Sequence, residues 1–201
     1  TIRPYYGIAP FILDSVASNP ERTLGQLLSF DLIVIAKPTE AFTDAEKYVL
    51  DQYIMNGGAS LWLLDGLAQK TDPDTGKTYL IGRDLGLGDL FFKYGARIQP
   101  NLVMDLECTP IALQTGVIGD KPQFELFPWY FYPRVTSRSN HPIVKSIDRV
   151  NLFFPNVIDT IETRGGDVKK EILLTTSDYS RYQRVPVNLT FEILRDQPNP
   201  D

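Results

Sequence analysis

The feature that most constrains the fold is a pair of uninterrupted apolar runs between residues 30 and 66. The first run, residues 31–36, has the sequence DLIVIA, and Lys37 and Pro38 follow it directly. The second run, residues 60–64, has the sequence SLWLL. Apolar side chains without alternation are typical of strands covered on both faces, as in a parallel sheet, and a proline ends such a strand. We therefore predict two buried strands.

The segment between these runs predicts a helix. Thr43 and Glu46 have the spacing of a capping box, in which each side chain binds the backbone N–H of the other residue. Residues 44–54 then place apolar side chains on one side and charged ones on the other. Gly57 and Gly58 supply the stop. Because parallel strands need a crossover of a dozen or more residues, we expect a strand-helix-strand unit with parallel strands.

The remaining segments before residue 108 extend this pattern. Residues 3–13 (RPYYGIAPFIL) predict a strand, and residues 21–29 (ERTLGQLLS) predict a helix with leucines on one face. Residues 71–78 (TDPDTGKT) consist of turn formers and predict an exposed loop. Residues 86–95 predict a short helix, and the sheet is expected to continue through residues 96–113.

From residue 108 the sequence changes to short apolar and aromatic runs broken by prolines and glycines. Such runs predict a β-rich, irregular continuation. We therefore expect an α/β fold in which residues 1–107 form a mostly parallel sheet with flanking helices. Residues 108–201 are expected to add a more β-rich half, packed with the first as one compact unit.

Composition excludes two classes of protein. The chain has 201 residues, of which 43% are apolar, so it is long enough and apolar enough to bury a core. Its 25 acidic and 20 basic residues are interspersed, which gives no basic footprint for nucleic acid. The longest apolar runs fall far short of the roughly 20 residues that span a bilayer. The start at Thr1 and the polar ending lead us to expect a piece of a longer precursor.

Partial matches to cofactor and metal motifs fail on their own requirements. A phosphate-binding loop ending at residues 76–78 (GKT) needs a glycine where Thr71 stands. A calcium loop over residues 72–83 would need glutamate in place of Arg83. The glycines of residues 86–91 lack the third member of a dinucleotide fingerprint. One histidine and one cysteine cannot hold zinc. We expect no cofactor and no metal.

Cys108 and His141 are the one candidate pair for nucleophilic catalysis. Cys108 lies in ECTPI, without the strand-to-helix elbow that exposes an activated nucleophile, and small apolar cysteines are common in cores. His141 lies in SNHPIV, which favours a turn and a structural role. Spacing leaves the pairing open, and the enzymatic interpretation is the least favoured. We expect no catalytic residue.

Two regions offer candidate ligand-binding side chains. Asp65 follows the second strand, and ligand sites in open α/β sheets lie beyond the carboxyl ends of strands, although capping of the next turn is the favoured role. The aromatic run 127–132 can provide stacking surfaces for a sugar ring or an anchor for a partner, while its alternate members fill the core. The candidate residues are Asp65, Trp129, Tyr130, Tyr132, Arg134 and His141.

Five long motifs follow one another along the chain, namely FDLIVIAKPTEAFTDAEKYVLDQYIMNGGASLWLLDG, LFFKYGARI, LVMDLECTPIAL, ELFPWYFYP and SNHPIVKSID. In this order they resemble a family of gliding-motility-associated ABC transporter auxiliary proteins (GldG) of Bacteroidetes. The resemblance runs from Ile8 to Arg181. It implies a membrane-anchored transporter subunit whose large soluble region faces the periplasm and which works with an ATPase subunit and a permease subunit. This chain resembles part of that region, without the family's membrane helices.

The resemblance also implies a fold. The family's soluble domain is similar to a domain of an intraflagellar transport protein and to the class I glutamine amidotransferase-like fold, with flavodoxin-like topology. Enzymes of that wider fold carry a cysteine nucleophile after a strand, whereas the comparable strand end here is LLDG, with Asp65. The resemblance therefore implies the fold without the activity.

These observations lead to one main functional expectation and two alternatives. We expect a non-enzymatic binding or assembly domain of an ABC transport complex, linked to gliding motility or envelope export. Its place would be the periplasmic side of the inner membrane, with anchoring through segments absent from this chain. The alternatives are a module that binds a glycan or another envelope ligand and, less favoured, an amidotransferase-like hydrolase.

Overall fold

The chain divides into two compact units, each with its own hydrophobic core. A computed structural model describes residues 3–13, 16, 18–163, 168–195 and 198. Unit 1 comprises Thr1–Leu64 and Leu85–Leu90, and unit 2 comprises Asp65–Asp84 and Phe91–Asp201. The short helix α3 (Gly88–Lys93) contains residues of both units.

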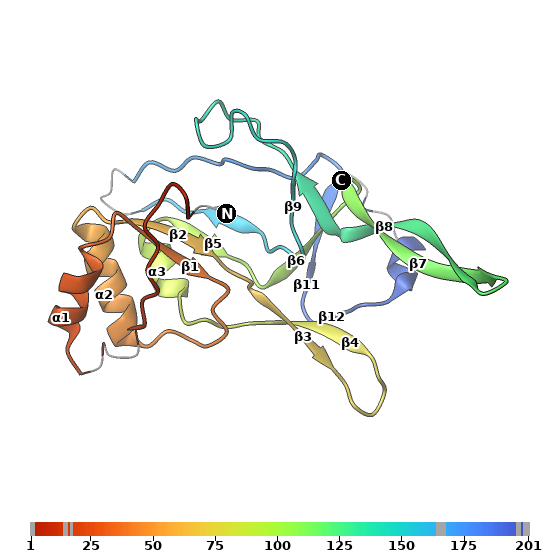
Figure 1. The fold of residues 1–201 in the computed structure, drawn as a ribbon, viewed down its shortest axis with the longest axis horizontal. Coiled ribbons are helices and arrows are strands. Elements are labelled where there is room, and N and C mark those ends of the chain that lie inside the picture. Colours follow the sequence, from red (N-terminus) through yellow and green to blue (C-terminus); the bar gives the residue numbers. More distant parts are fainter. Residues whose placement is uncertain (1–2, 14–15, 17, 164–167, 196–197, 199–201) are drawn as a thin grey trace. The chain divides into compact units, whose positions relative to one another are not determined.

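Unit 1 contains the strand-helix-strand element that the two apolar runs predict. Its elements are α1 (Pro20–Leu27), β1 (Leu32–Ala36), α2 (Asp44–Met55) and β2 (Ala59–Leu63). The two strands pair in parallel and in register, with Leu32 opposite Ala59 and Ala36 opposite Leu63. The two helices lie side by side (Figure 1). The predicted order of elements and the parallel pairing are confirmed.

Local side-chain contacts fix both ends of α2. The Thr43 hydroxyl accepts a hydrogen bond from the Glu46 N–H at 3.3 Å, and the Glu46 carboxylate accepts one from the Thr43 N–H at 2.7 Å. The predicted capping box is therefore confirmed. After the helix, Gly57 adopts a φ of +90°, a conformation that glycine reaches without steric cost.

Gly58 is required for a different reason, because a side chain there would strike Tyr53. A Cβ atom at Gly58 would lie 2.3 Å from the Tyr53 ring. That ring is fully buried, and its hydroxyl donates to the Phe30 and Ala59 carbonyl oxygens at 3.0 and 3.2 Å. Tyr53 thereby fastens the last turns of α2 to the beginnings of both strands.

Unit 2 is built from antiparallel strands. They are β3 (Leu67–Thr71), β4 (Thr78–Gly82), β5 (Ala96–Ile98), β6 (Asn101–Asp105), β7 (Cys108–Ile118), β8 (Lys121–Val135), β9 (Val150–Asn151), β10 (Ile158–Thr160), β11 (Ser180–Arg184) and β12 (Val187–Asn188), followed by the 3-10 helix η2 (Phe191–Arg195). They form the small sheets β12-β4-β3, β7-β8-β9, β10-β5 and β11-β6. The core of the unit gathers Leu80, Leu102, Met104, Phe131 and Val187.

The predicted fold class is wrong. In the described part of the chain, β1 and β2 are the one parallel pair, and the other sheets are small and antiparallel. There is no large parallel sheet with flanking helices, and so no flavodoxin-like arrangement, among the described residues. The predicted strand at residues 3–13 is also irregular.

The physical reason for the error is visible in β6. All five of its residues are buried, so both of its faces are covered. Its partner, β11, is antiparallel and comes from 180–184. An apolar run without alternation indicates that both faces of the strand are buried. Both faces can also be buried when the neighbouring strand is antiparallel, provided that other side chains cover them. The prediction that the parallel sheet continues through residues 96–113 was wrong because burial on both faces does not require parallel pairing.

Candidate functional site

The aromatic candidates belong to the core of unit 2. Trp129 and Tyr130 have only 7% and 3% of their surface exposed. Trp129 meets Phe131 edge to face, with ring centroids 5.1 Å apart. A ligand could not stack on these two rings without opening the core. Tyr132 is half-buried and packs edge to face on Phe153 at 4.7 Å.

Arg134 and Cys108 occupy the same part of this core. The Arg134 N–H donates to the Glu107 carbonyl oxygen at 2.8 Å, and its side-chain Nε is buried without a hydrogen-bond partner among the described residues. Burial raises the pKa of the Cys108 thiol, and the Trp129 backbone and the Arg134 charge offset only part of that shift. The thiol therefore stays protonated at neutral pH and is not an activated nucleophile.

His141 makes its hydrogen bonds within its own turn. Its N–H donates to the Ser139 hydroxyl at 3.0 Å, and its Nδ1 accepts from the Ile143 N–H at 3.3 Å. The His141 carbonyl oxygen accepts from Val144 and Lys145, both at 3.0 Å. These contacts give the ring a structural task. Asp65 is partly exposed in the connection between β2 and β3.

Asp105 has a structural role that its sequence context does not indicate. Asp105 is fully buried. Its carboxylate accepts from the Ser177 N–H at 2.8 Å, the Ser177 hydroxyl at 2.5 Å and the Glu107 N–H at 2.9 Å. All its contacts are internal, so Asp105 holds the 177–179 loop against the end of β6.

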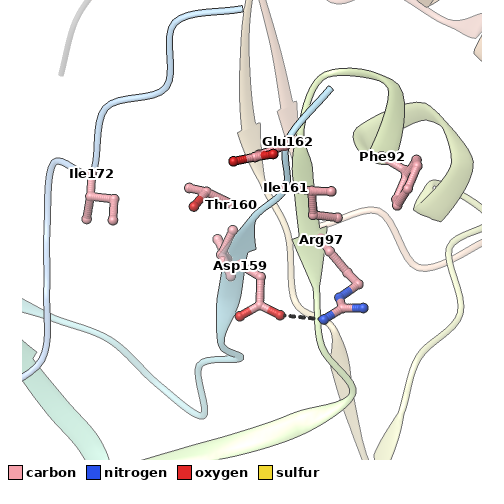
Figure 2. Close-up of a pocket in the computed structure, with 8 residues that line it drawn as sticks. Phe92, Arg97, Asp159, Thr160, Ile161, Glu162 and Ile172 are labelled. Carbon is pink, nitrogen blue, oxygen red and sulfur yellow. Dashed lines mark hydrogen bonds and ion pairs between the residues drawn. The ribbon is translucent and has the colours of Figure 1, made fainter. Parts of the chain in front are cut away.

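A shallow groove of about 560 Å³ lies in unit 2 and is lined by both apolar and charged side chains (Figure 2). There Arg97 of β5 pairs with Asp159 of β10 at 2.8 Å, and Asp159 also accepts a hydrogen bond from Gln99. The Arg97 guanidinium, and after it the Gln99 amide, lower the pKa of the Asp159 carboxyl. The remaining lining residues are Phe92, Ile158, Thr160, Ile161, Glu162 and Ile172.

The groove lacks the features of a catalytic centre. Its central charges satisfy each other, so they are not directed at a substrate, and Phe92, Ile158 and Ile172 are each more than half exposed around them. Across the described segments, no group of three His, Cys, Asp or Glu side chains could hold a metal ion. Asp72 is used by its own turn, where it accepts from the Asp74 N–H at 2.9 Å.

The parallel sheet of unit 1 presents a different kind of surface. Because paired residues of parallel strands point to the same side, the register places six side chains on one face, and every one of them is apolar and exposed. The four larger ones are between 46% and 51% exposed. The apolar face of β1–β2 consists of Leu32, Val34, Ala36, Ala59, Leu61 and Leu63.

The opposite face of the same sheet is covered. Ile33 packs against the core formed by α1 and α2. Trp62 lies against Phe42, with ring centroids 6.2 Å apart, and its Nε1 donates to the Ser60 hydroxyl at 3.0 Å. One side of the sheet therefore has the cover that strands of this composition require, and the other has none from the described residues of unit 1.

Comparison with known protein families decides the class of the chain. A family model described as an ABC-type uncharacterized transport system matches residues 1–201. The chain belongs to this family. It is thus an auxiliary component of an ABC-type transport system, which implies association with transporter components and points to a non-enzymatic role. No curated protein and no solved structure matches it.

Because an auxiliary component associates with transporter components, its exposed surfaces are of interest as well as its hollows. None of the helices in the described segments has the length and apolar character needed to cross a bilayer. The apolar face of β1–β2 differs from an ordinary solvated surface, because all six of its side chains are apolar. The sequence indicates this face only through two apolar runs without polar alternation. The runs do not indicate which face of the strands remains exposed.

Proposed function

We propose that this chain is a non-enzymatic assembly domain of a GldG-like ABC transport complex, on the periplasmic side of the inner membrane. It would be joined to the membrane through segments outside this chain, and the complex would serve gliding motility or envelope export. The membership in a transport auxiliary family supports the assembly role. The periplasmic placement rests on the resemblance of the long motifs to the GldG family.

The observation that carries the proposal is the apolar face of β1–β2. Contiguous apolar surface on a water-soluble domain marks a contact with another protein or a membrane, and parallel strands are normally buried on both faces. Val34 and Leu61 are paired at the centre of this face and are 51% and 46% exposed. We propose that an apolar surface of the permease subunit covers them.

The test is co-purification with the transporter. The double variant Val34→Glu with Leu61→Lys removes the apolar centre of the face but places opposite charges across the strand pair, so the pairing itself is preserved. We expect the wild-type chain to co-purify with the ATPase and permease subunits and the double variant to lose them. Gln26→Lys, at an exposed position of α1, is the matched surface control.

Two results would contradict this function. The double variant could retain the transporter subunits as well as the wild type does. It could also lose its own stability in urea, which would mean that the face is packed within the chain and is not available to a partner. Circular dichroism of the purified variant distinguishes the second result from a specific loss of binding.

A further inference from the structure

The longest element of unit 2 is a hairpin whose outer half is exposed. β7 and β8 pair from Cys108 and Pro133 at the base to Ile118 and Lys121 at the tip. This hairpin arm projects from its unit as a twisted ribbon (Figure 1). At its outer end the large apolar side chains are 59% to 71% exposed, namely Val117, Ile118, Phe124 and Leu126.

The two outer edges of the arm differ in composition. An open strand edge offers unpaired N–H and C=O groups to any other strand, and proteins protect such edges with prolines and charges. The edge of β8 carries both along its outer half, in the form of Lys121, Pro122, Glu125 and Pro128. From residue 111 to residue 118, β7 carries neither a proline nor a charge.

The edge of β7 is also unoccupied. In the described part of the chain, β7 pairs with β8 alone, whereas β8 also pairs with β9 at Arg134 and Val135. A register shift at Thr115 interrupts β7, which leaves residues 111–114, between Pro110 and this shift, as its regular stretch without a proline. This stretch can accept a further strand.

We infer that β7 pairs with β7 of a second copy of this chain, antiparallel and across a two-fold axis. In such a contact residue i of one copy meets residue j of the other, so a charged residue at the axis would meet a like charge. Because residues 111–118 carry no charge, in a chain of net charge −5, a two-fold axis at any position along them brings no like charges together.

A membrane surface explains the tip less well. Asp120 and Glu125 flank Lys121 there, and an acidic balance does not favour an anionic bilayer. The strand pairing uses unit 2 and does not depend on the contact proposed for the apolar face of β1–β2. Either proposal can fail without the other.

Sedimentation velocity of the full chain over a range of concentrations tests the pairing. We expect the wild type to dimerise and Gln114→Lys to raise the dissociation constant on the order of tenfold or more, because two like charges would lie close to the axis. Gln123→Lys is the matched control, since it makes the same substitution at an exposed position of β8. It should leave the dissociation constant unchanged.

Disulfide crosslinking gives the geometry. In a Cys108→Ser background, single cysteines at Ala112, Leu113 and Gln114 should crosslink to their own counterparts with a yield that peaks at one position, the residue nearest the axis. A wild-type chain that stays monomeric overturns the inference, whether the arm then binds anionic vesicles or another subunit. Equal weakening by Gln114→Lys and Gln123→Lys, or crosslinking without a peak, overturns it as well.

Discussion

The polar contacts inside unit 1 and those inside unit 2 differ in how far apart their partners lie along the chain. In unit 1, the Thr43 and Glu46 cap joins residues three apart, and Tyr53 reaches Ala59 and Phe30, which lie six and 23 residues away. In unit 2, Asp105 binds Ser177, which is 72 residues further along the chain. The first kind of contact restrains one helix, whereas the second closes a long loop.

This difference has an energetic consequence. A long loop costs only slightly more to close than a medium one, because the entropy of closure rises with the logarithm of its length. A buried carboxylate that accepts several hydrogen bonds can meet that cost, but its removal leaves buried donors without partners. Unit 2 should therefore depend on a few buried polar residues, and unit 1 on the sum of smaller local contacts.

The substitution Asp105→Asn should have the largest effect. The new amide nitrogen would face the Ser177 N–H and hydroxyl or the Glu107 N–H, all of which are donors. We expect a loss of roughly 3 kcal/mol in the free energy of unfolding. Urea unfolding followed by Trp129 fluorescence, in a Trp62→Phe background, reports unit 2.

The control for this variant lies in the same loop. Asp178 is 81% exposed and pairs with Arg138 at 2.8 Å, and an exposed ion pair contributes at most about 1 kcal/mol. Asp178→Asn should therefore leave the midpoint almost unchanged. Equal shifts for Asp105→Asn and Asp178→Asn would show that burial of the carboxylate is not what stabilises unit 2.

Gly58→Ala should have the next largest effect, and it falls in unit 1. The new Cβ would lie 2.3 Å from the buried Tyr53 ring, so the ring must move away from its two carbonyl partners. We expect a loss of about 2 kcal/mol, measured by the ellipticity at 222 nm during urea unfolding. Gly25→Ala in α1 is the control, since nothing lies within 4 Å of its Cβ and alanine favours a helix. A neutral Gly58→Ala would contradict the packing.

Thr43→Ala tests the local cap alone. The variant removes the hydroxyl that accepts the Glu46 N–H, and loss of such a cap costs about 1 kcal/mol. The same unfolding measurement should show a smaller shift than Gly58→Ala does. Thr39→Ala, at an exposed position before the helix, should show none. If Thr43→Ala lowered the free energy of unfolding as much as Asp105→Asn, unit 1 would depend on single polar residues as strongly as unit 2 does.

The reach of these contacts also explains what the sequence can predict. The cap of α2, its glycine stop and both strands of unit 1 follow from residues close together in the chain, and the structure confirms them. The pairing of β6 with β11 is different, because no local pattern selects a partner from 180–184. Such a choice is made by the packing of the whole unit.

The candidate site follows the same division. The run LIVIA of β1 predicts an apolar strand, but which of its faces stays open depends on where the helices pack. Trp129 and Tyr132 are candidates because their rings can stack on a ligand, and alternation in a strand puts part of this aromatic run on the outer side. The register cannot tell that Trp129 and Tyr130, which are neighbours on opposite sides, are both buried. Asp105 shows the same limit, since two of its three donors belong to Ser177 in a distant loop.

Substitution of Asp159 should have the smallest effect. It tests whether the strength of a contact depends on the separation of its partners along the chain or on their burial. Arg97 lies 62 residues from Asp159, so this pair spans almost as much chain as Asp105 and Ser177, but the Arg97 side chain is 59% exposed. Arg97, and then Gln99, lower the pKa of Asp159 in the folded chain. Its contribution to stability is therefore present above the pKa of an unfolded aspartate and is lost as the pH falls through the lower, folded value.

Asp159→Asn should accordingly lower the unfolding midpoint slightly at pH 7, and the difference from the wild type should vanish in acid. Salt should also reduce it, because exposed charges are screened. Asp120→Asn, at the exposed tip of the arm, should show no such pH dependence. If Asp159→Asn instead cost as much as Asp105→Asn and did so at every pH, separation along the chain would outweigh burial. A small effect that disappears in acid would show that long-range contacts in unit 2 are strong only where water is excluded from them, as it is around Asp105.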